Sequence, residues 1–245
     1  MDYDVVVVGG GPSGSASAIL LSKMGYNVAV VDKAKFPRDK VCGDGLSGKS
    51  VGILRELGIE DEFEEVPNRY SDGVLFSSPD GTMLEVEIPK EKQKEIHGHV
   101  IRRVDFDNLL ASKAKESCTF LEEHSVIDVV KEGEKIVGVR AKGPKGIVEV
   151  RGKIVIGADG AGSIVAMKTG QGQLPPEHMY LGVRAYYDGV EGMSDKIELH
   201  FIDEVLPGYF WIFPLEGKKA NVGVCMLRSD QQKSRADLKK LMEDA

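Results

Sequence analysis

The sequence lacks long apolar runs and has few cysteines. No stretch reaches the ~18 apolar residues that a membrane-spanning helix needs, and the N-terminal segment has no basic region of the signal-peptide kind. The three cysteines, Cys42, Cys118 and Cys225, are scattered and odd in number, which argues against a disulfide framework and for a reducing compartment. We therefore expect a cytoplasmic protein, for which composition leaves peripheral contact with a membrane open.

The sequence also lacks an excess of basic residues, and it has no cysteine and histidine spacing typical of a zinc site. The formal net charge is −7, so nucleic-acid binding has no electrostatic support. The cysteines and histidines are not paired at metal-binding intervals, and we expect no metal site. The 245 residues, 42% of them hydrophobic, suffice for one large domain or two small ones.

What is present begins with a strand, a helix and a second strand in the first 32 residues. The short β-branched runs YDVVVV and YNVAVVD each predict a buried strand, and the helical segment between them opens with GGGPSG. Gly9, Gly11 and Gly14 stand in G-x-G-x-x-G register, and Asp32 follows at close to the usual ~20-residue interval. Because all these parts occur in order, a dinucleotide site is favoured over an ordinary glycine-rich turn.

Each residue type in this pattern suits one task. Gly9 permits the tight turn out of the strand, Gly11 leaves bare backbone where a pyrophosphate can approach, and Gly14 lets the helix pack closely. The helix N-terminus favours the phosphate charge, and the Asp32 carboxylate can accept a hydrogen bond from a ribose hydroxyl.

The remaining sequence predicts a mixture of helices and antiparallel strands. We expect the following elements: a helix capped by Ser47 and ended by Gly58, a hairpin over 71–88, a strand over 98–103, a helix capped by Asp105, a meander over 125–151, a buried strand over 153–157, long strands over 180–228, and a helix over 234–243. The predicted fold class is α/β, with a nucleotide-binding domain interleaved with a second, sheet-rich α+β domain.

Three motifs together resemble a flavoprotein superfamily. GGGPSG, RRVDFDNLL and GADGAGS are similar to motifs of the aromatic hydroxylases, halogenases and isoprenoid reductases, whose nucleotide is FAD. FPRDKVCGDGLS and PGYFWIFPLEGKKANVGV resemble, more narrowly, the geranylgeranyl reductase family, which reduces C=C bonds of polyprenyl chains on lipids or chlorophyll precursors. The resemblance implies a Rossmann-like FAD-binding domain over 1–70 and 99–178, and an antiparallel substrate domain over 71–98 and 179–245.

The resemblance also implies which residues bind FAD. They are Gly9, Gly11, Pro12, Ser13, Gly14, Asp32, Lys33, Cys42, Gly43, Arg103, Val126, Asp159 and Gly160. Arg103 would contact the pyrophosphate, for which a permanently charged guanidinium is suited, although a surface ion pair is the alternative. Val126 would contact adenine through its backbone, or serve only as core. Ala166 stands where the wider superfamily has an arginine, which weakens a hydroxylase-type NADPH contact there.

In the reductase family the loop around Cys42 lies beside the flavin ring. Cys42 is therefore a candidate catalytic residue that would tune flavin reduction or help to protonate the product, and a thiol that only fills space is the alternative. Gly43 and Gly45 would let the backbone approach the ring.

Tyr209, Trp211 and Phe213 alternate along one predicted strand and so share a face. They are the candidate substrate residues, because an aromatic surface can hold an apolar chain, and a sandwich core is the alternative. Tyr209 and Phe213 differ from the halogenase form of this motif.

The resemblance predicts an FAD-dependent reductase acting on an isoprenoid lipid, with NADPH or a ferredoxin-like protein as electron donor. A flavin-dependent monooxygenase or halogenase, and a quinone-linked electron-transfer flavoprotein, are the alternatives. The family's third FAD motif would come after Ala245, so we expect this chain to be part of a longer protein.

Overall fold

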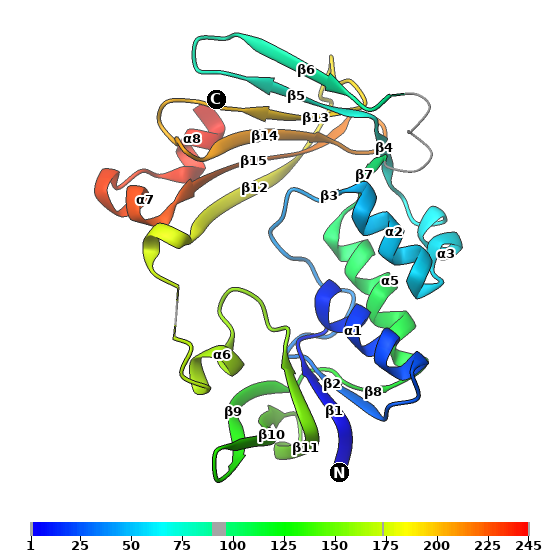
Figure 1. Ribbon diagram of the computed structural model, residues 1–245. Helices are drawn as coiled ribbons and strands as arrows, with labels where there is room; N and C mark the ends of the chain where they lie inside the picture. Colours follow the sequence, from blue (N-terminus) through cyan, green and yellow to red (C-terminus); the bar gives the residue numbers. More distant parts are fainter. Residues whose placement is uncertain (1, 90–96, 173, 245) are drawn as a thin grey trace. The chain divides into compact units, whose positions relative to one another are not determined.

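The computed structural model describes residues 2–89, 97–172 and 174–244 (Figure 1). The chain divides into two compact units, each made of two segments: unit 1 comprises residues 1–39 and 104–173, and unit 2 comprises 40–103 and 174–245. Residues 40–70, 99–103 and 174–178, which we expected in the nucleotide domain, belong to unit 2. Part of the expected substrate domain, residues 90–96, lies outside the described residues.

Unit 1 is built on a six-stranded sheet in the order β8-β2-β1-β11-β10-β9. The bounds are β1 Asp2–Val8, β2 Val28–Val31, β8 Thr119–Leu121, β9 Ser125–Glu132, β10 Lys135–Gly143 and β11 Gly146–Gly157. β8, β2, β1 and β11 run parallel, and β10 and β9 are antiparallel. The valines of β1 and β2 are the centre of the core, as their continuous β-branched runs predicted.

The meander and the following strand, predicted separately, are joined in one long strand, β11. Its first half pairs antiparallel with β10 up to Arg151, and its second half pairs parallel with β1 up to Gly157. The predicted strand over 153–157 is confirmed as the end of β11, but its predicted burial is wrong, because Ile154 is 58% exposed. A central position in a sheet buries the backbone, whereas the side chains stay exposed on any face that no described residue covers.

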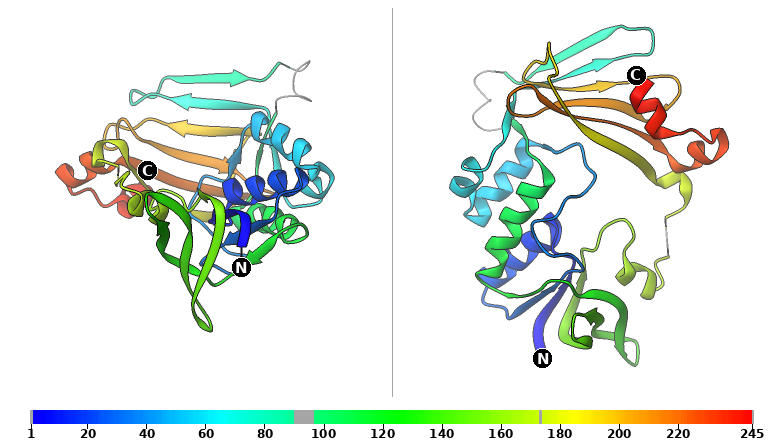
Figure 2. Two further views of the ribbon diagram at one scale, coloured as in Figure 1. Left: turned by 60° about the horizontal axis from the view of Figure 1, so that its bottom comes forward. Right: turned by 180° about the vertical axis from the view of Figure 1, so that it is seen from behind.

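Helices α1 (Pro12–Lys23) and α5 (Arg103–Lys115) lie side by side in both views (Figures 1 and 2). α1 buries the small residues Gly14, Ser15 and Ala18 against β1 and β2. The expected cap of α5 is wrong: the helix begins at Arg103, so Asp105 lies in its first turn. An acidic side chain is favoured in the first turn as well as at the cap, and sequence alone did not separate these positions. The short α6 (Ile164–Lys168) follows β11.

Unit 2 is built on a second six-stranded sheet in the order β12-β15-β14-β13-β5-β6, which Figure 2 shows from two sides. The bounds are β5 Gly73–Ser77, β6 Met83–Glu87, β12 Tyr180–Asp188, β13 Lys196–His200, β14 Tyr209–Pro214 and β15 Lys219–Leu227. All pairs are antiparallel except β13 with β5. The predicted hairpin over 71–88 is confirmed as β5 and β6, and the predicted fold class is confirmed by both units.

A small sheet, β3-β7-β4, and two helices complete the first segment of unit 2. The bounds are β3 Gly45–Leu46, β4 Arg69–Ser71, β7 Gly98–Val100, α2 Gly48–Leu57 and α3 Glu60–Glu64. Both predicted ends of α2 are confirmed. The Ser47 hydroxyl accepts a hydrogen bond from the Ser50 N–H, and Gly58 has a left-handed backbone with φ of 65°.

The chain's last described part differs from the single predicted helix over 234–243. Two short helices, α7 (Arg228–Ser234) and α8 (Leu238–Asp244), are separated by Arg235, whose backbone is left-handed. A single turn, η1 (Pro176–His178), precedes β12. Among the described helices of both units, none has the length and apolar character needed to cross a bilayer.

His99 of β7 is a buried titratable group, 3% exposed and packed against the rings of Phe63 and Tyr70. Its Nδ1 lies 2.6 Å from Oδ1 of Asn68. Burial lowers the pKa of His99 from 6.5 to about 4. The imidazole is therefore neutral in the folded protein under conditions where the unfolded chain binds a proton.

This difference predicts a pH dependence of stability. His99 contributes stability that is complete above pH 6.5 and is lost as pH falls through about 4, because the folded-state pKa is the lower one. Between about pH 7.5 and 4.5, we expect the unfolding free energy of the wild type to fall by ~2 kcal/mol more than that of His99→Phe, measured by urea unfolding. His178→Phe, at an exposed histidine, is the control and should keep the wild-type slope. Equal slopes for wild type and His99→Phe would contradict the assignment.

Candidate functional site

The glycine-rich turn after β1 depends on close backbone approach at two positions. Gly9 has φ of 100°, in the left-handed region, and a Cβ there would overlap the carbonyl group of Ala158. A Cβ at Gly14 would overlap the carbonyl oxygen of Gly9. Gly9 is therefore required by the conformation of the turn, and Gly14 by the close packing of α1 on β1.

The N-terminus of α1 presents bare backbone. Gly11 is its N-cap, no side chain caps it, Pro12 follows, and the first turn carries no acidic residue. The positive end of the helix is therefore neither capped by a side chain nor offset by an acid in this turn, which suits an anion. A Cβ at Gly11 would come within 3.4 Å of only one group, Nη2 of Arg38.

Asp32 directly follows β2 and holds the glycine-rich turn. Its Oδ2 accepts a hydrogen bond from the Gly10 N–H at 2.6 Å, and its Oδ1 accepts one from the Ala34 N–H at 2.7 Å. The buried carboxylate thus shapes the turn, and each carboxylate oxygen has a further lone pair for a ligand hydroxyl.

A cavity of about 470 Å³ gathers predicted residues from four segments of unit 1. Gly9, Asp32, Lys33, Val126 and Asp159 line it. The other lining residues are Val8, Val31, His124, Ser125, Ile127, Gly162 and Ile164. The cavity lies where the parallel strands β1, β2 and β11 end, the edge at which such sheets bind ligands. His124 and Ser125 were missed, because a single histidine before a strand has no distinguishing pattern.

Asp159 organises the second glycine-rich turn. It accepts hydrogen bonds from the Ser163 hydroxyl at 2.5 Å and from the Ile164 N–H at 2.7 Å. Gly160 has a φ of 80°, which a side chain rarely adopts. The predicted pair Asp159-Gly160 therefore forms a turn whose acid holds the start of α6.

Sequence reasoning did not assign Arg38 to the first glycine-rich turn, although this arginine lies close to it. Its Nη1 lies 2.5 Å from Oδ2 of Asp107, which is fully buried, and its Nη2 is the group nearest to a Cβ at Gly11. The buried carboxylate fixes the guanidinium beside the N-cap of α1. The only sequence signal for this arginine is a basic residue that follows Pro37.

Arg103, the arginine that the resemblance assigned to the pyrophosphate, belongs to unit 2. It begins α5, and its backbone N–H donates to Oδ1 of Asp44 at 3.3 Å. It is not among the residues that line the cavity of about 470 Å³. The side-chain role predicted for it stays a prediction.

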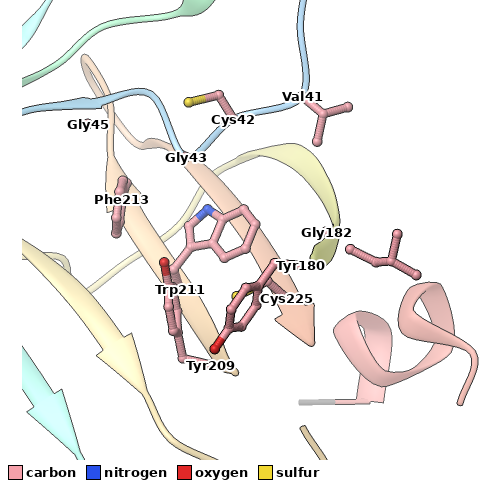
Figure 3. Close-up of a pocket in the computed structure, with 11 residues that line it drawn as sticks. Val41, Cys42, Gly43, Gly45, Tyr180, Gly182, Tyr209, Trp211, Phe213 and Cys225 are labelled. Atoms are coloured by element: carbon pink, nitrogen blue, oxygen red, sulfur yellow. The ribbon is translucent and has the colours of Figure 1, made fainter. Parts of the chain in front are cut away.

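Unit 2 holds an apolar pocket of about 550 Å³ between a loop and β14 (Figure 3). The loop is Val41–Gly45, hereafter the pocket loop, and the opposite side is the aromatic row, Tyr209, Trp211 and Phe213. Neighbouring rings of this row have centroids 6.2 Å and 6.4 Å apart. Tyr180, Leu181, Gly182 and Cys225 complete the lining.

Strand alternation places the aromatic row in the pocket. Phe210 and Ile212 point to the opposite face of the sheet, where they belong to a core that includes Leu238 and Met242 of α8. The core expected as an alternative for the aromatic row is thus made by the intervening residues of the same strand.

Gly43 and Gly45 bring the pocket loop against Phe213. A Cβ at either glycine would lie 2.9 Å or 3.0 Å from the Phe213 ring, closer than side chains ordinarily pack. The glycines were expected to let the backbone approach a flavin. In the structure they permit approach to an aromatic ring of the pocket, and the flavin contact of Gly43 stays a prediction.

A buried polar network, which sequence reasoning missed, lies behind the pocket. Asp44 accepts hydrogen bonds at its Oδ2 from Asn221 Nδ2 at 2.7 Å and from the Tyr186 hydroxyl at 2.8 Å. Burial raises the pKa of Asp44, and its hydrogen bonds to Asn221 and Tyr186 oppose that rise. A single asparagine in the apolar strand KANVGVCML was the available signal.

Cys225 is a second thiol of the pocket. It lies directly opposite Tyr209 in the β14–β15 pairing and lines the pocket beside it. Burial raises the pKa of both groups, so the thiol and the phenol stay protonated at neutral pH. Sequence reasoning had separated Cys42 and Cys225 by 183 residues without a motif to join them.

Comparison with known proteins matches residues 2–241 to the family described as FAD binding domain. The chain is 36% identical to digeranylgeranylglycerophospholipid reductase 1 of Methanopyrus kandleri, over 91% of this chain and 58% of that protein. It is 32% identical to a menaquinone reductase of Mycobacterium tuberculosis, over 98% of this chain and 59% of that protein.

A solved structure is also similar. The crystal structure of a geranylgeranyl bacteriochlorophyll reductase-like protein from Thermoplasma acidophilum matches with a TM-score of 0.85 and 27% identity, over 99% of this chain and 61% of that one. The chain thus spans about three fifths of the length of the relatives it matches.

The glycine contacts predict the effect of one methyl group. Gly14→Ala would force α1 away from the Gly9 carbonyl, and we expect ADP binding about tenfold weaker or worse, a loss of ~1.4 kcal/mol, by titration calorimetry. Gly52→Ala is the matched control, because a Cβ there meets nothing within 4 Å and alanine favours the helix α2. Unchanged ADP affinity in Gly14→Ala would show that the turn does not bind the nucleotide.

Proposed function

The chain belongs to the FAD binding domain family, and from this premise we propose that it is part of an FAD-dependent reductase that saturates C=C bonds of geranylgeranyl or other polyprenyl groups on lipids. The name digeranylgeranylglycerophospholipid reductase, carried by relatives that match more than nine tenths of the chain, supports this substrate class. The observation that carries the proposal is the pocket, in which an aromatic row faces the loop whose motif resembles the reductase family.

Unit 1 fits the ADP part of FAD. The pyrophosphate would lie at the glycine-rich turn of Gly9 and Gly14 and at the N-terminus of α1, which begins after Gly11. The ribose and adenine would occupy the cavity beside Asp32. Arg38 adds a fixed positive charge beside Gly11. Pro12 and Ser13 are the first residues of α1. We propose that they contact FAD, together with Lys33, Val126 and Gly160.

The chemistry of the reduction comes from FAD, which when bound and reduced supplies a hydride for an alkene carbon. The residues of the pocket would hold the polyprenyl chain of the substrate, exclude water and supply a proton. The pocket loop carries Cys42, and the aromatic row presents the Tyr209 hydroxyl beside Cys225. We assign Cys42 to the proton that completes the addition, or to tuning flavin reduction.

The space available for a polyprenyl chain extends beyond the first pocket. A second cavity of about 510 Å³ in unit 2 shares Gly45, Tyr209 and Phe213 with it. Its other side is largely aliphatic, with Val74, Val86, Ile88, Ile197 and Leu199. Two adjoining apolar cavities of this size suit a chain of several isoprene units better than a compact aromatic ring.

The electron donor in this proposal is NADPH or a ferredoxin-like protein. Peripheral contact with a lipid surface is part of the same proposal. Leu84 and Val86 of the edge strand β6 are 60% and 47% exposed, and Val86 also lines the second cavity. An exposed apolar edge beside the cavity would let a lipid chain enter without crossing water.

The proposal predicts oxygen-independent saturation. With dithionite as reductant and no oxygen, the protein loaded with FAD should convert a digeranylgeranyl lipid into products heavier by two hydrogens per reduced bond, measured by mass spectrometry. The control omits FAD. A product that forms only with oxygen, or with oxygen and halide, would overturn the reductase in favour of a monooxygenase or halogenase.

The role of Cys42 makes a separate prediction. Cys42→Ser should lower the rate of alkene reduction by about 10²-fold, the usual worth of a positioned acid, or leave partly reduced chains, whereas FAD occupancy should not change. Cys118→Ser is the matched control. Its thiol lies in unit 1, donates to the Ala114 carbonyl and has a pKa raised by burial to about 11. Normal rates and products in Cys42→Ser would leave this cysteine a packing residue.

A further inference from the structure

Asn221 is a fully buried amide in the middle of β15, where the surrounding residues are apolar. Its side chain makes three of the four hydrogen bonds that an amide can form. Nδ2 donates to the Cys42 carbonyl and to Oδ2 of Asp44, each at 2.7 Å. Oδ1 accepts a hydrogen bond from the Trp211 indole N–H at 2.9 Å. One amide therefore joins the pocket loop to the aromatic row.

The loop needs this partner because it carries a buried acid in an unfavourable backbone conformation. Asp44 is 1% exposed and has a φ of 67°, which residues other than glycine rarely adopt. Besides Asn221, its carboxylate accepts from the Tyr186 hydroxyl and the Arg103 N–H. Without the Asn221 amide, the carboxylate would lose a donor in a place that water does not reach.

We propose that Asn221 is a positioning residue that sets the width of the pocket between Cys42 and Trp211. It does not line the pocket, so it acts through these two residues and not on the substrate. This inference rests on the proposed reductase function and deepens it. The gap held by the amide decides how an apolar chain lies between the loop and the indole ring.

A residue selected for stability alone would be different here. A leucine, which has the same branching of heavy atoms, would match the apolar strand, and a buried polar side chain contributes little net stability compared with a well-packed apolar one. The amide supplies three directed contacts that no apolar side chain supplies. Its geometry specifies one arrangement of loop and row.

The test compares a variant that removes the donors of the amide with a variant that removes its donors and its acceptor. Asn221→Asp keeps an acceptor for the Trp211 N–H but loses both donors and places a second carboxylate beside Asp44. Asn221→Leu loses all three contacts. Val222→Ala is the matched control, because Val222 is the next residue of β15 and packs in the core on the opposite face, away from the network.

Two measurements need no reductase activity. Trp211 is the only tryptophan, so fluorescence reports its surroundings directly. Its emission maximum should shift in Asn221→Leu, which removes the acceptor of the indole N–H, and stay close to wild type in Val222→Ala. Alkylation of Cys42 by iodoacetamide, followed by mass spectrometry relative to Cys118 in the same molecule, should be at least threefold faster in both Asn221 variants and unchanged in Val222→Ala.

The third measurement uses the reduction of a digeranylgeranyl lipid. Both Asn221 variants should lower kcat tenfold or more with a smaller change in KM, while Val222→Ala keeps wild-type kcat. Wild-type alkylation rates in Asn221→Asp, or equal effects in Val222→Ala and Asn221→Leu, would overturn the positioning role. If the wild type reduces no polyprenyl lipid, the proposed function fails, and fluorescence and alkylation still decide the role of Asn221.

Discussion

The side chains of an extended strand alternate between its two faces, and the candidate site of unit 2 depends on this constraint. In β14 it sends Tyr209, Trp211 and Phe213 to the pocket and Phe210 and Ile212 to the core below. In β15 it sends Asn221 and Cys225 to the pocket side, opposite Phe213 and Tyr209. A shift of one residue in register would exchange the pocket lining with the core, so the same packing that stabilises the sheet also determines the pocket.

Two buried acids shape the loops of the two units in similar ways. Asp32 holds the glycine-rich turn through the Gly10 and Ala34 N–H groups, and Asp44 holds the pocket loop through Asn221 and Tyr186. Each carboxylate is removed from water and receives donors in return, which gives the loop one conformation where glycines would allow many. Loops rich in glycine can thus be ordered without a hydrophobic core of their own.

Much of the fold could be predicted because its signals are local. The β-branched runs of β1 and β2, the cap at Ser47, the left-handed Gly58 and the hairpin of β5 and β6 each follow from a few neighbouring residues. The predictions that were wrong concern burial and boundaries. Ile154 is exposed although its strand is central, and α5 begins two residues before its expected cap at Asp105. What covers a strand face, and which of two polar residues starts a helix, depends on distant packing.

By itself, the sequence determined the βαβ fingerprint, the order of the elements and the residue types of the aromatic row, since these depend on spacing along one segment. Only the tertiary structure decided that Arg38 is held beside Gly11 by Asp107, that Asn221 joins Cys42 and Trp211, and that Cys225 faces the same pocket. The partners in these contacts are separated by up to 179 residues in the chain. Their pairing follows from strand register and loop closure, which no local spacing encodes.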